Sequence, residues 1–183
     1  MSPEVVAALF GVLGGVLIER VARSWGWLWC EPSEWKLEFW TQYLDEQGYE
    51  RQKLLPPEEE DRAQWVTYSV HLDLFNGKEI PVGLRDISIV FSCDDGEVVS
   101  KPLSTTGGVQ RPYGGPVDYP VMRIINLLPR QWDFVALHND LRGPEDVRLL
   151  LGWQKVEFVG QRQRRGPLER KTYRKLIASR VLA

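Results

Sequence analysis

Four polar side chains have the residue types and the spacing that could hold a metal ion. His71 and Asp73 are two positions apart, and His138 and Asp140 repeat that spacing. Residues two apart on an extended strand point to the same side, so each pair could present an imidazole and a carboxylate together. Nothing in the sequence brings the two pairs to one place, and exposed His and Asp are ordinary on a strand's polar face. A metal-dependent enzyme is therefore the third interpretation, and we predict no metal, no cofactor and no catalytic residue.

Aromatic rings provide a second candidate site, because exposed rings on a sheet can bind sugars or peptides. Trp40 and Trp65 fall on the polar faces of the strands that contain them. Arg111 and Tyr113 lie in Ser104–Pro120, a segment rich in glycine and proline that is long for a connection inside a compact domain. We predict a ligand-binding site from these four residues. The tryptophans that suit the core are Trp35, Trp132 and Trp153.

The elements that would position such sites follow one uncharged segment, Val5–Ile18. As a helix it would be about 21 Å long, which is shorter than the roughly 30 Å of a bilayer's hydrocarbon core. It is apolar on every side, as a helix immersed in lipid must be. The acidic start of the chain argues against a signal peptide. We predict a membrane-inserted helix, with a core or partner-bound helix as the alternative.

The residues after this segment suit the edge of a membrane. Arg20 and Arg23 can extend toward the headgroups, and Trp25, Trp27 and Trp29 carry rings suited to the same layer. The side with more Arg and Lys usually faces the cytoplasm. We therefore predict a single-pass membrane protein with its C-terminal domain in the cytoplasm.

Small residues recur along one face of the predicted helix. Ala7, Gly11 and Gly15 are spaced four residues apart, a pattern that lets two membrane helices approach closely. This spacing indicates a homo-oligomer formed through the N-terminal helix. The alternative is that Gly and Ala are simply common in membrane helices.

The C-terminal segment is strongly basic. Residues 161–183 hold eight of the 23 Lys and Arg side chains but one of the 25 acidic ones, which leaves 15 basic and 24 acidic side chains before them. Leu168–Ala183 places apolar residues on one helical face. The basic residues around that face are Arg170, Lys171, Arg174 and Lys175. We predict a basic amphipathic helix that contacts anionic membrane lipid. Nucleic acid is the less favoured partner, and a solvated tail is the other alternative.

The middle of the chain has the alternating pattern of β-strands. In Trp65–Phe75 every second residue is apolar, and Asp94-Asp95-Gly96 is a hairpin turn. We expect Asp45–Arg62 to be a polar connection. The predicted strands are Glu34–Leu44, Trp65–Phe75, Leu84–Ser92, Glu97–Leu103, Val121–Leu127, Trp132–His138, Val147–Trp153 and Lys155–Val159.

Seven or eight short strands with turns between them are typical of an antiparallel β-sandwich, immunoglobulin-like in class, with a barrel as the alternative. We predict an anchor over residues 1–30, a sandwich over 31–160 and a tail over 161–183. The two cysteines, Cys30 and Cys93, fit a reducing compartment. The expected function is a non-catalytic interaction or sensing module that binds another protein. A sandwich that binds a small ligand or sugar is the alternative.

Overall fold

The computed structural model describes residues 26–106, 108–110, 117–163 and 170–180. The long strands are β1 Leu28–Leu44, β3 Trp65–Asn76, β4 Val82–Cys93, β10 Trp132–Leu141, β11 Trp153–Gln163 and β12 Arg170–Ser179. The short strands are β2 Glu50–Leu54, β5 Gly96–Ser100, β6 Leu103–Ser104, β7 Val109–Gln110, β8 Val117–Asp118 and β9 Ile124–Leu127. The helical elements are η1 Pro57–Arg62 and α2 Pro144–Leu151.

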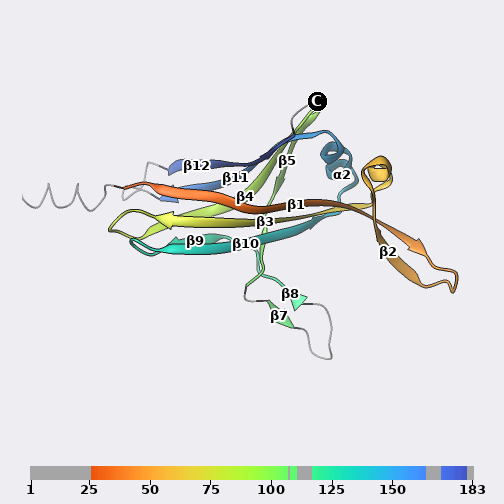
Figure 1. Cartoon of the computed structure of the whole chain (residues 1–183), viewed down its shortest axis with the longest axis horizontal. Coiled ribbons are helices and arrows are strands. Elements are labelled where there is room, and N and C mark those ends of the chain that lie inside the picture. Colours follow the sequence, from red (N-terminus) through yellow and green to blue (C-terminus); the bar gives the residue numbers. More distant parts are fainter. Residues whose placement is uncertain (1–25, 107, 111–116, 164–169, 181–183) are drawn as a thin grey trace, which may run out of the picture.

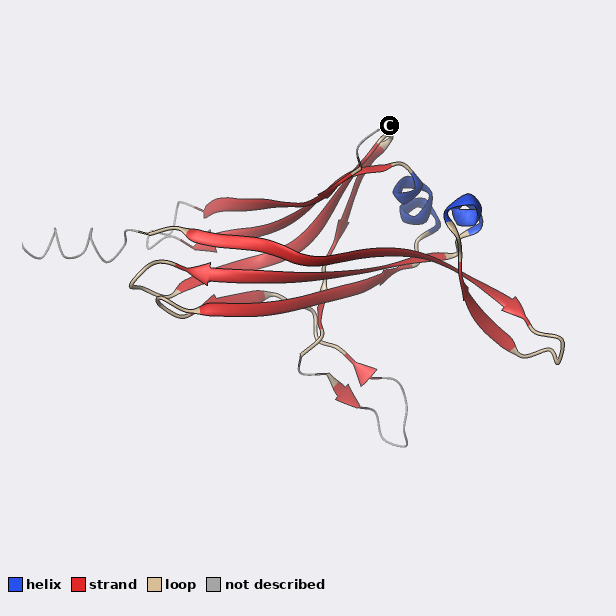
Figure 2. Cartoon of the chain, viewed as in Figure 1, coloured by secondary structure: helices blue, strands red, loops and turns tan. Residues whose placement is uncertain are grey.

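These strands form two main antiparallel sheets (Figure 1). The first sheet has the order β2-β1-β3-β10-β6, and the second has the order β12-β11-β4-β5, with β9 also paired to β4. The β7 and β8 strands pair separately. Figure 2 shows that both short helices lie at the same end of the molecule, away from the start of β1. The predicted mainly β, antiparallel sandwich is confirmed at this level.

The central strand β3 shows why the sequence forms this layer. Val66, Tyr68, Val70, Leu72 and Leu74 are fully buried, and the residues that alternate with them are only partly buried on the outer face. Burying a side chain of this size stabilises the fold by about 2 kcal/mol, so the alternating pattern determines which face of the strand turns inward. The alternation predicted for this strand is confirmed.

The second sheet closes the core from the other side. Ile87, Ile89 and Phe91 of β4 are buried against the first sheet, as predicted. The Tyr68 ring packs edge-on against Phe91, and its hydroxyl lies 2.8 Å from the Ser100 hydroxyl, which satisfies a polar group inside the core.

One predicted strand is a helix. The expectation for Val147–Trp153 is wrong, because α2 covers most of that segment. Pro144 begins the helix, and Glu145 and Asp146 lie in its first turn, where acidic side chains interact favourably with the helix dipole. Val147 and Leu150 are three residues apart and are both buried, which is helical rather than strand spacing.

The predicted C-terminal amphipathic helix is also wrong. Its middle forms β12, an edge strand that pairs with β11 from Gln163↔Arg170 to Lys155↔Ser179. The edge of β11 offers backbone groups that need partners, and a short isolated helix has little stability of its own. Pairing with β11 is therefore more favourable than forming a helix, and the described part of the tail belongs to the second sheet.

The expected polar connection Asp45–Arg62 is more ordered than the sequence suggested. It contains β2 and η1, and β2 pairs with the end of β1 from Trp40↔Leu54 to Leu44↔Glu50. We call the paired segment 41–54 the arm. All five residues of β2 are exposed, and the arm projects past η1 and α2 in Figure 1.

The N-terminal predictions lie largely outside the described residues, including Ala7, Gly11, Gly15, Arg20, Arg23 and Trp25. No helix in residues 26–106, 108–110, 117–163 or 170–180 is long and apolar enough to cross a membrane. Strand β1 reaches into the segment predicted as the anchor, residues 1–30, because Trp29 and Cys30 pair with Phe75 and Leu74. The sheet therefore starts at Leu28.

Candidate functional site

The outer face of the first sheet carries the four candidate metal ligands, His71, Asp73, His138 and Asp140. His71 on β3 lies opposite Glu34 on β1, with 3.0 Å between its Nδ1 and the Glu34 carboxylate. The ring of Phe134 on β10 packs edge-on against His71, 5.3 Å between centroids. The Lys36 ammonium, 2.7 Å from Glu34, holds the pKa of that carboxyl below its usual value, with a smaller contribution from His71. This patch is a polar and aromatic surface.

The four metal candidates share this face but do not form a cluster. In the register, His71 lies opposite Ala136 while His138 lies opposite Ser69, so the two histidines are diagonal neighbours on adjacent strands. Asp140 accepts a hydrogen bond from Thr67 at 3.0 Å. Within the part of the chain that the structure describes, no group of three or more His, Cys, Asp or Glu side chains could hold a metal ion.

The remaining groups that could do chemistry are shielded. Burial lowers the pKa of His138, although the nearby Asp140 carboxylate opposes that shift. Burial raises the pKa of the Cys30 thiol to about 11 and also raises that of Cys93. A thiol is nucleophilic only as the thiolate, so neither cysteine is activated at neutral pH.

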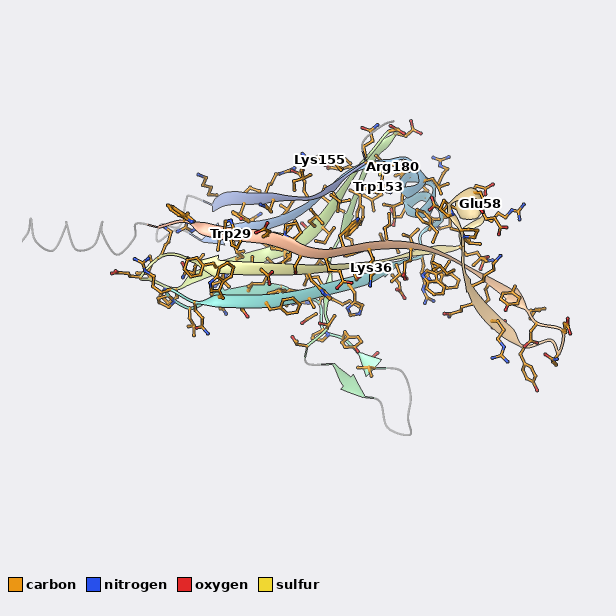
Figure 3. The ribbon with its side chains drawn as sticks, in the orientation of Figure 1. Trp29, Lys36, Glu58, Trp153, Lys155 and Arg180 are labelled. Atoms are coloured by element: carbon orange, nitrogen blue, oxygen red, sulfur yellow. The ribbon has the colours of Figure 1, made fainter. Side chains whose placement is uncertain are left out.

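Aromatic side chains gather at one end of the outer face. Trp29 and Trp132 both lie opposite Phe75 in the register, and each Trp ring is 5.0 Å from a neighbouring ring. Trp132 is 55% exposed, so its assignment to the core is wrong. Figure 3 labels Trp29 at the end of β1 nearest the N-terminal trace. We call Trp27, Trp29, Phe75, Leu128 and Trp132 the aromatic end.

The two tryptophans that the sequence placed on polar strand faces are largely covered. Trp40 and Trp65 are opposite each other on β1 and β3, but Trp65 is only 9% exposed and Trp40 is partly buried. The Arg142 guanidinium lies 5.6 Å from the centre of the Trp65 ring and covers it. The other predicted core rings, Trp35 and Trp153, do pack against the core.

The long segment 104–120 is described only in part, and Arg111 and Tyr113 lie outside the described residues. Next to it, between β9 and β10, is an open hollow of about 280 Å³. Ser104, Thr106, Met122 and Phe134 are among the residues that line it. Neither Trp40 nor Trp65 is among the residues that line this hollow.

The arm is the feature that sequence reasoning missed. Its tip is held by Asp45, whose carboxylate accepts hydrogen bonds from the backbone N–H of Tyr49 at 2.8 Å and from Arg51 at 2.9 Å. These bonds hold the pKa of the Asp45 carboxyl below its usual value, the Tyr49 N–H most strongly. Leu44 and Tyr49 are each about two thirds exposed, at 67% and 66%. Asp45 four residues before Tyr49 was the available signal for a turn.

The basic residues predicted to face lipid are on β12 rather than on a helix. Strand alternation places position 174 on one face and positions 171 and 175 on the other. The Arg174 guanidinium is 3.1 Å from the Glu157 carboxylate. Lys155, and after it Arg174, hold the pKa of Glu157 below its usual value. Lys171 and Arg174 are both exposed, and Arg174 pairs with Glu157.

Comparison with known proteins identifies no family. No family model and no curated protein matches this chain. A protein of known structure from Archaeoglobus fulgidus is 7% identical over 84% of this chain and 100% of that chain, with a TM-score of 0.40. The putative ApaA protein from Bordetella pertussis is 12% identical over 81% of this chain and 91% of that chain, with a TM-score of 0.28. Similarities this weak support no conclusion about function.

Proposed function

We propose that this protein is a single-pass, membrane-tethered β-sandwich that acts as a non-catalytic interaction module and binds a protein partner in the cytoplasm through its arm. The arm is the observation that carries this proposal. A two-stranded ribbon has little stability by itself, yet this one projects from the sandwich with both faces uncovered. The large apolar side chains that it exposes are Tyr43, Leu44, Tyr49 and Leu54.

Exposed rings and leucines on a projecting element suit a protein interface, where aromatic side chains supply most of the binding energy. The arm lies at the opposite end of the sandwich from the start of β1 at Leu28 (Figure 1). A partner could therefore reach it while Val5–Ile18 is held in a bilayer. The immunoglobulin-like type of the sandwich and oligomerisation through the N-terminal segment belong to the same proposal.

A photo-crosslinking residue at Tyr43 is expected to give one discrete cross-linked product in the membranes of the source organism. Leu44→Ser together with Tyr49→Ser should remove that product, because both side chains are exposed and contribute to binding rather than to folding. The matched control is a photo-crosslinker at Val99, which is also exposed, at 60% against 47% for Tyr43, but lies on β5. Equal products from positions 43 and 99, or a product that survives the two serine substitutions, would contradict the proposal.

The basic strand supports a separate prediction about membrane lipid. A protein without residues 1–25 should bind vesicles rich in anionic lipid, and binding should weaken as salt rises. Lys171→Gln with Lys175→Gln should lower the affinity by more than about ten-fold, because each basic group near an anionic surface contributes about 1 kcal/mol.

Vesicle co-sedimentation measures this change. Arg174→Gln is the matched control and should have the smaller effect, because Arg174 already pairs with Glu157. Equal binding by all variants would show that β12 does not contact lipid, and preferential binding to nucleic acid would favour the rival partner.

A further inference from the structure

We propose that the aromatic end inserts into the headgroup layer of the membrane. The sandwich would then contact the bilayer directly and have a fixed orientation relative to it. This inference rests on the proposed membrane insertion of Val5–Ile18. It adds a lipid-contacting surface, made by three strands and a turn that are far apart in the sequence, and it assigns an orientation to the whole domain.

The composition of the aromatic end fits this layer. Trp27 is 75% exposed, Leu128 is 58% exposed, and Trp132 is more than half exposed at the same end of the sheet. Indole rings favour the boundary between hydrocarbon and water, because they combine a large apolar surface with one polar N–H group. In water alone, such a group of exposed rings would be unfavourable on a folded domain.

The chain geometry places this surface close to the proposed anchor. Eight residues separate Ile18 from Trp27, and even fully extended they would span only about 30 Å. The segment just before β1 is held against the sheet, since the Gly77 backbone N–H donates a hydrogen bond to the Trp27 carbonyl oxygen at 3.0 Å. Gly26 has a positive φ of 121°, and a Cβ there would lie 2.3 Å from the Gly77 carbonyl oxygen. The close backbone contact holds the start of β1 against the β3–β4 turn.

The charges around the aromatic end suit an anionic lipid surface. Lys171 lies near the start of β12 and pairs with Arg162 on β11. Arg162 in turn pairs with Leu84 near the start of β4, so Lys171 lies at the same end of the molecule as the aromatic end. Arg130 is also exposed there, next to Trp132, with Glu79 at 3.6 Å. Basic side chains at the rim and rings at the centre are the arrangement expected of a surface that meets lipid headgroups.

Fluorescence quenching in vesicles tests the orientation. The full chain would be reconstituted in phosphatidylcholine vesicles with roughly 30% phosphatidylserine, an anionic lipid of the cytoplasmic leaflet. A fluorophore would be attached at Leu128→Cys or, as the matched control, at Val99→Cys, both with Cys93→Ser. Cys30 can remain, since it is 1% exposed and its thiol is protonated at neutral pH. Lipids that carry a nitroxide at the headgroup should quench position 128 at least about three times more strongly than position 99.

Two further measurements distinguish lipid from a second copy of the chain as the group that covers the aromatic end. Trp27→Ser with Trp132→Ser should reduce the quenching at position 128, whereas Leu176→Ser, an exposed apolar residue on β12, should not. Equal quenching at positions 128 and 99 in a chain that remains in the vesicles would overturn this inference alone. Shielding at position 128 that rises with the protein-to-lipid ratio, without quenching by the lipid, would assign the surface to a second copy of the chain. A chain that fails to enter the vesicles would overturn both this inference and the proposed tether.

Discussion

Replacing Asn76 with alanine is expected to lower the free energy of unfolding by about 3 kcal/mol or more. Asn76 is fully buried, and its side-chain amide donates hydrogen bonds to the carbonyl oxygens of Ile80 at 2.8 Å, Leu128 at 3.1 Å and Leu127 at 3.3 Å. Its side-chain oxygen accepts a hydrogen bond from the backbone N–H of Lys78 at 3.1 Å. One side chain thus joins the β3–β4 turn to the β9–β10 turn.

Alanine would remove all four hydrogen bonds at once and leave a small cavity, which is why the effect is large for one substitution. For a domain of this size, the loss corresponds to a fall in Tm of about 10 °C, measurable by thermal unfolding of the full chain in detergent. The matched control is Asn126→Ala on the neighbouring strand β9, where the side chain is exposed and the change should be within about 0.5 kcal/mol. Equal losses in the two variants would contradict the role assigned to Asn76.

Removal of residues 1–25 is expected to make the protein extractable from membranes by high salt or alkaline carbonate, with the sandwich intact. The full chain should instead resist extraction by alkaline carbonate, because Val5–Ile18 is uncharged and is followed by Arg and Trp residues. The measurement is the distribution of each form between the membrane pellet and the supernatant, together with a thermal unfolding curve.

Removal of residues 1–30 should behave differently from removal of residues 1–25. It would also delete Leu28, Trp29 and Cys30 from β1, including a cysteine that is 1% exposed in the core. Loss of a buried side chain and three strand pairs should cost about 2–4 kcal/mol. A soluble full-length monomer without detergent would contradict the anchor, and equal stability of the two truncated forms would contradict the boundary at Leu28.

The errors in the sequence analysis have a common physical origin. Leu149-Leu150-Leu151 and the basic tail have patterns that fit either a short strand or a short helix, and local preference differs little between the two. Pro144 and the acidic residues of the first turn favour the helix that contains Leu149-Leu150-Leu151. The basic tail forms a strand because it pairs with the edge of β11. The solvent exposure of Trp132 likewise depends on which elements pack over its end of the sheet. The local pattern of residues carries no information about that packing.

The sequence by itself determined that the middle of the chain is an antiparallel β structure, because alternation along β3 and β4 assigns each side chain to one face. It also identified the uncharged N-terminal segment and the concentration of positive charge at the other end of the chain. Only the tertiary structure decided which side chains meet. It set His71 against Glu34, grouped Trp29 with Trp132, and extended the arm beyond the core. These contacts depend on strand order and register between segments distant in sequence, and neither is encoded in the local spacing of residues.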